Sequence, residues 1–200
     1  MNFRTVQGCG EQRRYTQVWG GSCWSGCGAT AWAMLYGWND LRGVCNLIGP
    51  CSSPTPNSND GNVNDCIWYE VPWLSTFCIF SQGATLPSDM WKGYHWASAR
   101  GYSIGWNFHW GIPYVLSSAG RNDCITAIQS GRPAIVGTGF YNHYPLAWGY
   151  AYREYHLPVF GWTVAHARYF FVNEGWGGDP CAGCWVSADD TFYGSNVTCW

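Results

Sequence analysis

The chain has 200 residues, of which 47% are hydrophobic and only 11% are charged, so it can bury a core and is not a disordered chain. Its formal net charge is −2, and its ten basic residues include a single lysine, Lys92, without any basic run. A DNA or RNA site needs several clustered cations, so we expect no nucleic-acid partner. No apolar run reaches the roughly 18 residues of a membrane-spanning helix, so we expect no membrane span.

The chain contains eleven cysteines, spread from Cys9 to Cys199. This density indicates an oxidising compartment and therefore a secreted or cell-surface protein, in which Asn196-Val197-Thr198 is a candidate glycosylation site. Residues 1–14 lack the apolar core of a signal peptide, so any export signal is removed or absent from this chain. Because eleven is odd, we expect five disulfides and one free thiol with a chemical role. The disulfide candidates are Cys9, Cys23, Cys45, Cys51, Cys66, Cys78, Cys124, Cys181, Cys184 and Cys199.

The best helix candidate is Cys27 to Trp38, which is apolar on nearly every side, as a buried helix is. The turn-rich segment 49–61 is expected to be a surface loop. A short helix at Asn122 to Gln129, closed by Gly131, leads into the second half of the chain. That half reads as strands at Pro133 to Gly137, Tyr144 to Tyr152, Ala167 to Asn173 and Trp185 to Ala188.

This order of elements predicts an α+β fold in a single domain, residues 1–200. Residues from 1 to about 105 would form a helical, disulfide-rich lobe, and residues from about 106 to 200 an antiparallel β lobe. A catalytic cleft is expected between the two lobes.

Cys27 stands at the predicted start of the buried helix. The unpaired N–H groups and the helix dipole at that end favour a thiolate over a thiol. A nucleophilic thiolate also needs an imidazole to share its proton, a group that orients the ring, and donors for the oxyanion. The sequence contains candidates for each of these roles.

Three segments carry a resemblance to a known family. Gly26-Cys27-Gly28-Ala29-Thr30-Ala31-Trp32-Ala33-Met34 resembles the nucleophile helix of papain-fold cysteine peptidases, most closely the streptopain-like and bacteriocin-leader-peptidase-like branches. Asn142-His143, followed by Gly149-Tyr150, has the spacing of the family's histidine strand. Phe171 to Gly178 resembles the segment that carries the family's asparagine and tryptophan, and the order Gln, Cys, His, Asn is also that of the papain fold.

The resemblance implies a role for five residues. Cys27 would be the nucleophile and His143 the general base and then acid. Asn173 would orient the imidazole, and Trp176 would cover the His–Asn pair. Gln17 would donate to the oxyanion together with the backbone N–H of Cys27. No cofactor and no metal are implied.

Cys23 is a rival nucleophile. Gln17 precedes Cys27 by ten residues but Cys23 by six, which is the papain spacing, and Cys23-Trp24 reproduces the papain-like Cys-Trp pair. We prefer Cys27, because the Ala-Thr-Ala pattern that follows it belongs to the nucleophile helix. The 30 residues from His143 to Asn173 also exceed the papain interval, which predicts an insertion around 153–166 that lengthens a hairpin and overhangs the cleft.

The middle of the chain, from about Asn39 to Arg121, matches no family. Cys181-Ala182-Gly183-Cys184 has the spacing of half a zinc site, but without a second pair we expect disulfides and no metal.

The sequence therefore predicts a secreted cysteine peptidase, a thiol-protease hydrolase that cleaves peptide or protein substrates through a thioester. One alternative is a non-catalytic, disulfide-rich surface or assembly module of the same fold, which would self-associate through an aromatic surface, since 18% of the residues are aromatic. Another is an acyltransferase that uses the same three residues. A free Cys27 that faces His143 beside an open cleft would favour an enzyme over the module.

Overall fold

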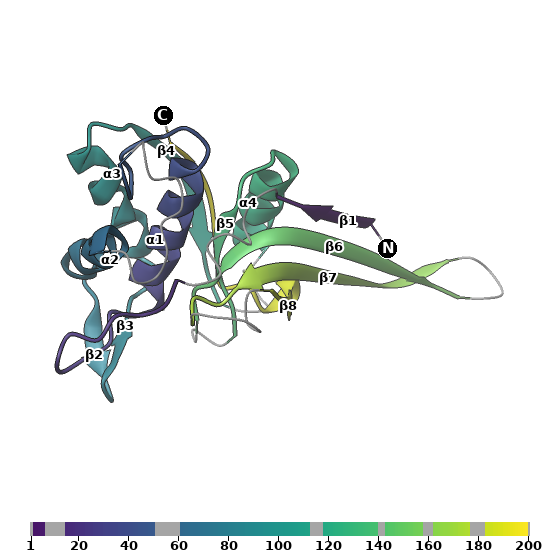
Figure 1. Cartoon of the computed structure of the whole chain (residues 1–200). Coiled ribbons are helices and arrows are strands. Elements are labelled where there is room, and N and C mark those ends of the chain that lie inside the picture. Colours follow the sequence, from purple (N-terminus) through teal and green to yellow (C-terminus); the bar gives the residue numbers. More distant parts are fainter. Residues whose placement is uncertain are drawn as a thin grey trace.

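The computed structural model describes residues 2–6, 15–50, 61–112, 118–139, 143–157, 162–176 and 183–199. It has a mixed α+β fold, in which most of the helices lie at one end, the helix of residues 118–129 packs against an antiparallel sheet, and the long strands of that sheet lead away from the helices (Figure 1). The helices are α1 (Cys27–Asp40), α2 (Gly61–Trp73), α3 (His95–Ala99) and α4 (Ser118–Gln129), with 3-10 turns η2 (Met90–Tyr94) and η3 (Ala188–Asp190).

The strands divide into a large sheet and a small hairpin. The described strands of the large sheet run in the order β4-β9-β5-β6-β7-β8, and β1 pairs with β6 beside β5. Their bounds are β1 (Asn2–Thr5), β4 (Ile104–Trp110), β5 (Ala134–Gly137), β6 (Leu146–His156), β7 (Thr163–Asn173), β8 (Cys184–Ser187) and β9 (Tyr193–Cys199). The hairpin consists of β2 (Phe77–Ile79) and β3 (Gln82–Ala84).

Helix α1 forms the centre of the larger core. Every residue from Gly28 to Asn39 is buried, in agreement with the apolar pattern on all sides of the predicted helix. Two buried indole N–H groups of this core have partners: Trp32 of α1 donates to the carbonyl of Met90 at 2.8 Å, and Trp96 of a neighbouring helix donates to that of Leu47 at 2.6 Å. These bonds let large aromatic side chains fill the core without leaving a donor unpaired.

The sequence predicted α1, α4 and the strands β5 to β8 close to their observed positions. It missed α2, α3, the hairpin β2–β3 and the strands β4 and β9, most of which fall in the unmatched middle. It also missed β1, which joins the large sheet although it lies at the N-terminal end of the expected helical lobe. The sheet therefore takes strands from both sides of the expected division near residue 105.

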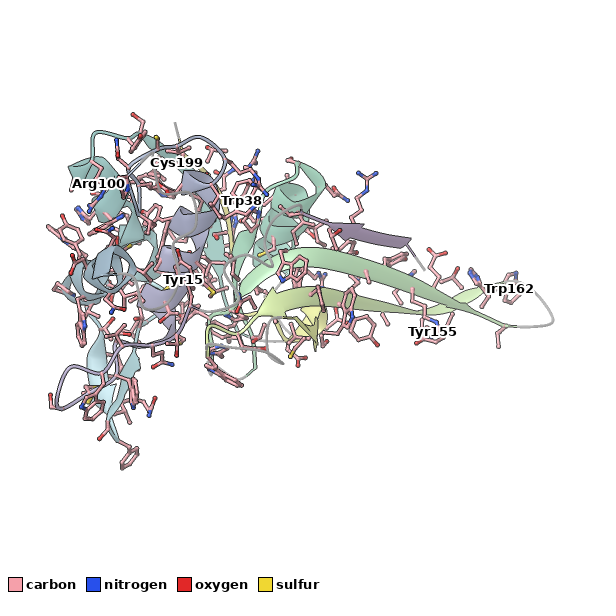
Figure 2. All side chains as sticks on the ribbon, in the orientation of Figure 1. Tyr15, Trp38, Arg100, Tyr155, Trp162 and Cys199 are labelled. Atoms are coloured by element: carbon pink, nitrogen blue, oxygen red, sulfur yellow. A yellow bond between two sulfur atoms is a disulfide. The ribbon has the colours of Figure 1, made fainter. Side chains whose placement is uncertain are left out.

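Strands β6 and β7 form a long two-stranded arm. They pair from Leu146↔Asn173 to His156↔Thr163, and the ribbon leads away from α1 (Figure 1). Tyr155 and Trp162 lie along its outer part, 39% and 68% exposed (Figure 2). The insertion thus lengthens a hairpin as predicted, but the described part of this hairpin leads away from α1 and does not overhang the region of Cys27 (Figure 1).

The pairing of the described cysteines differs from the predicted five disulfides and one free thiol. Cys23 is bonded to Cys78, and Cys45 is also disulfide-bonded. Cys27, Cys66, Cys124 and Cys199 are free thiols, which corrects the prediction for the last three. Cys66 and Cys124 are fully buried, where a cysteine acts as a small apolar side chain. Cys184 begins β8, and the candidates Cys9, Cys51 and Cys181 lie outside the described residues.

No helix within the described part of the chain is long and apolar enough to cross a membrane.

Candidate active site

Cys27 is the first residue of α1. Gly26 precedes it with a φ of 87°, a conformation that favours glycine and turns the chain into the helix. Cys27 is a half-buried free thiol at a helix end whose first N–H groups have no partner within the helix. Cys23, the rival, is held in its disulfide and has no thiol to react.

His143 lies opposite Cys27. A short antiparallel bridge fixes its backbone, because the N–H of Thr138 donates to the carbonyl of His143 at 2.9 Å. Burial by itself would lower the pKa of His143, but hydrogen-bonding and charge interactions with Cys27 and Glu174 outweigh it and raise this pKa to about 10. At neutral pH His143 is therefore an imidazolium that faces the thiol group of Cys27.

Glu174 makes the contact that the resemblance assigned to Asn173. Its carboxylate Oε2 lies 2.9 Å from Nε2 of His143, and its backbone carbonyl oxygen lies 2.7 Å from the same nitrogen. Both side chains are nearly buried, 11% exposed for Glu174 and 12% for His143. With Nε2 occupied, Nδ1 is the ring nitrogen left to interact with Cys27.

Asn173 shapes the turn that brings Glu174 to His143. It is the last residue of β7 and its side chain is buried, where Oδ1 accepts a hydrogen bond from the N–H of Gly175 at 3.0 Å. Gly175 has a φ of 71°, which completes the turn. Glu174 directly follows this residue, so the turn presents both its backbone carbonyl and its carboxylate to the imidazole.

Trp176 covers the histidine. Its ring centre lies 5.2 Å from that of His143, and the residue bridges to the backbone of Thr16. The indole is 57% exposed, so it lies between the imidazole and solvent.

Gln17 is next to that bridge and lines a cavity of about 260 Å³ with Trp24, Gln82 and Trp176. Its Oε1 atom is buried and has no hydrogen-bond partner among the described residues. The loop that follows is tied to α1 because the N–H of Val18 donates to Oγ of Ser25 at 3.0 Å. This side-chain amide at the edge of a cavity is in a position to bind a substrate group.

A second cavity of about 300 Å³ opens at Cys27 itself and is lined by Ile79, Phe80, residues 82–85 and Tyr144. Gln82 borders both cavities, so the two are neighbours at this residue. The hairpin β2–β3 approaches closely: a Cβ at Gly26 would lie 2.6 Å from the carbonyl oxygen of Gly83. The two glycines allow this contact, and the Cys23–Cys78 bond ties the hairpin to the loop before Cys27.

The other free thiols differ from Cys27 in their environment. Burial raises the pKa of Cys124 to about 12 and that of Cys199 to about 11, and it raises the pKa of Cys66 well above its ordinary value. These three therefore remain protonated and unreactive at neutral pH.

The remaining predicted residues lie elsewhere. Asn196 is in β9, partly buried, and its Oδ1 accepts a hydrogen bond from Arg132 at 2.8 Å, so the sequon lies in a strand and not in a loop. Among the described residues, no group of three or more His, Cys, Asp and Glu side chains is arranged to hold a metal ion.

The structure thus brings His143 to Cys27, places Trp176 over His143, and adds Glu174 as a second partner of the imidazole. Gln17 lies at the neighbouring cavity, which it shares with Trp176. Sequence reasoning missed Glu174 because the resemblance supplied an asparagine for its role at the preceding position. The signal was present: an acidic side chain between that asparagine and a glycine, in a chain with twelve acidic residues. No family model, characterised protein or solved structure matches this chain.

Proposed function

We propose that the protein is a cysteine peptidase with a papain-like arrangement of two lobes, acting on peptide or protein substrates outside the cytoplasm. The observation that carries the proposal is the alignment of Cys27, His143 and Glu174 beside an open cleft. The helix start supplies the nucleophile, and the end of β7 supplies the charge that holds the imidazolium.

In the first half of the reaction, the Cys27 thiolate attacks the carbonyl carbon of the scissile peptide bond. The oxyanion that forms accepts hydrogen bonds from the backbone N–H of Cys27 and from the Gln17 side-chain amide. The His143 imidazolium gives its proton to the leaving nitrogen, the C–N bond breaks, and an amine leaves the thioester behind.

In the second half, the negative charge on Cys27 is gone because its sulfur is part of the thioester. One of the interactions that raise the pKa of His143 is therefore removed, which lowers this pKa and lets the ring stay neutral after it has given its proton to the amine. Neutral His143 takes a proton from water, which attacks the thioester carbonyl. The C–S bond breaks, the carboxylic acid leaves, and the thiolate and imidazolium are restored.

The cleft indicates where a peptide would bind. Ile79 and Phe80 of the hairpin β2–β3 are exposed at one cavity, and Trp24 and Trp176 at the other. Apolar walls of this kind suit substrates with large apolar side chains next to the cleaved bond. The disulfide that anchors this hairpin supports an oxidising location.

The direct test is labelling with an epoxide that alkylates nucleophilic thiols, followed by mass spectrometry of the peptides. We expect modification at Cys27 in the native protein, its loss in Cys27→Ala, and unchanged labelling in Cys199→Ala, a matched change at a free, partly buried thiol. Cleavage of a peptide library should stop in Cys27→Ala alone. Labelling at Cys199 or Cys66 with Cys27 unmodified would contradict the proposal.

Acyl transfer would share the first half of this reaction and differ in the acceptor. Adding an amine such as glycinamide during peptide cleavage separates the two. If the acyl group is transferred to glycinamide faster than it is hydrolysed, the protein is a transferase. If the free acid is the main product, it is a hydrolase. A non-catalytic module is less favoured, since Cys27 is free and the cleft beside it is open.

A further inference from the structure

A separate groove of about 690 Å³ lies at the base of the arm, between α4 and the strands β1, β6 and β7. Its volume is in the range of small-ligand sites. The described residues that line it include none of those at the Cys27 cleft. They are Arg4, Asn122, Ile125, Gln129, Tyr150, Tyr152 and Arg168.

The floor and wall are built from regular elements. Arg4 lies directly opposite Tyr150 on neighbouring strands, and Tyr152 lies directly opposite Arg168. Asn122, Ile125 and Gln129 are spaced by three and four residues, so they occupy one side of α4. The groove is therefore formed by rigid strands and a helix and not by loops.

The described lining carries two arginines and no carboxylate. The nearest acid to Arg168 is Asp189 at 3.9 Å, and Asp189 is already paired with Arg121 at 2.7 Å. Arg4 has no ion pair with any described residue. The groove therefore keeps excess positive charge in a chain whose net charge is −2.

Arg168 is held in place before any ligand binds. Its guanidinium lies 5.6 Å from the centre of the Tyr152 ring, and it forms a side-chain hydrogen bond with Tyr150. Its side chain is 30% exposed. A guanidinium fixed in this way loses little entropy when it binds a planar anion, which is a recurrent use of arginine.

We propose that this groove is a binding site for a single carboxylate group, with the Arg4 and Arg168 guanidiniums on the anion and the two tyrosine rings against the remainder of the ligand. A more highly charged anion is disfavoured, because Asp189 lies on one side and Glu154 accepts a hydrogen bond from the Tyr152 hydroxyl on another. The carboxylate can belong to a small molecule or to an acidic side chain of a polypeptide.

The test follows backbone amide chemical shifts of the ¹⁵N-labelled Cys27→Ala protein, so that no peptide is cleaved. The probes are acetyl-Tyr-Glu-Tyr-amide, its glutamine counterpart, N-acetylglutamate and inorganic phosphate. We expect saturable shifts at Ile125, Tyr150 and Arg168 with the glutamate peptide, and affinity weakened roughly tenfold by Arg4→Gln or Arg168→Gln. Raised salt should weaken the same binding.

Arg153→Gln is the matched control. Arg153 follows Tyr152 on β6 and lies over Tyr155, on the opposite face of the strand from the groove. Its loss should leave the affinity unchanged. Arg4 is exposed, so Arg4→Gln keeps the test valid even if Arg168→Gln unfolds the arm.

The outcomes divide clearly. Equal binding of the glutamate peptide and N-acetylglutamate supports a small carboxylate, and tenfold tighter binding of the peptide supports an acidic polypeptide segment. The proposal is overturned if no saturable shift occurs at the groove, or if the glutamine peptide binds as tightly as the glutamate peptide. It is also overturned if phosphate binds more tightly than the glutamate peptide, or if Arg153→Gln weakens binding as much as Arg4→Gln or Arg168→Gln does.

Discussion

Glu174 Oε2 lies 2.9 Å from Nε2 of His143, and both side chains are nearly shielded from water. A carboxylate at this position is a charged hydrogen-bond acceptor beside the ring, whereas an asparagine would offer only a dipole. Charge-assisted hydrogen bonds are about twice as strong as neutral ones. His143 is thus held as an imidazolium and in one orientation by the same side chain.

Replacing Glu174 by Gln tests that role. The amide keeps the shape and can keep a hydrogen bond, but it removes the charge, and a hydrogen bond to a charged group contributes about 1.5–3 kcal/mol. We expect kcat/KM for peptide cleavage to fall about 10- to 100-fold. Glu154→Gln, on the exposed part of the arm, is the control and should leave the rate unchanged. Full activity in Glu174→Gln with loss in Asn173→Ala would return the orienting role to Asn173.

The pKa of His143 gives an independent prediction. An NMR titration of its ring should show a pKa near 10, because the interactions with Cys27 and Glu174 both favour the imidazolium and outweigh the opposite effect of burial. Cys27→Ala and Glu174→Gln should each lower that pKa by a unit or more. Since the folded pKa exceeds the unfolded value near 6.5, this interaction stabilises the protein fully below about pH 6.5, and its contribution is lost as the pH rises through 10. An ordinary pKa in the intact protein would contradict the ion pair.

The sequence predicted the parts of the site that depend on local pattern. Helix α1 follows from an unbroken apolar segment after small residues, and the strand that leads to Asn173 follows from aromatic and β-branched residues. The position of Glu174 depends on how the chain turns at Gly175. Such a turn after a strand produces no repeating pattern in the sequence, so the sequence alone could not predict where the glutamate lies.

Long-range contacts explain the other misses. Strand β1 is four residues long and is stabilised by pairing with β6, about 145 residues further along the chain. The Cys23–Cys78 pair and the burial of Cys66 and Cys124 depend on packing between elements, and cysteine counts alone do not determine pairing. The cleft wall at Gly83 requires a close backbone approach that only the folded chain shows.

Removing the Cys23–Cys78 disulfide should destabilise the protein and loosen the cleft. The bond closes a sequence separation of 55 residues, for which the chain-entropy relation gives about 4 kcal/mol. The hairpin β2–β3 has only two strands and depends on such an anchor. We expect Cys23→Ser/Cys78→Ser to lower the free energy of unfolding in urea by about that amount and to slow epoxide labelling of Cys27. Cys124→Ser is the control for general destabilisation, because Cys124 is buried and has no disulfide. If Cys124→Ser slowed the labelling of Cys27 to a similar extent, the specific role of the hairpin would be contradicted.

Glu70 is a fully buried carboxyl group in α2 and leads to a prediction about pH. One oxygen accepts the N–H of Trp96 at 3.2 Å, while Oε2 has no hydrogen-bond partner among the described residues. Burial raises the pKa of Glu70 well above its usual range, and the bond from Trp96 opposes this only in part.

Because the folded protein holds this proton more tightly than the unfolded chain, stability should fall as the pH rises above the unfolded value of about 4.3. Glu70→Gln keeps an acceptor for Trp96 and carries no titrating group, so it should be more stable than the native protein at pH 7 by about 1 kcal/mol or more. Urea unfolding between pH 4 and pH 8 measures how the free energy of unfolding of the native protein and of Glu70→Gln changes with pH. Asp65→Asn is the control, because Asp65 is an exposed acid on the same helix. If the native protein and Glu70→Gln kept parallel stability profiles across that range, Glu70 would not be the group that limits stability at neutral pH.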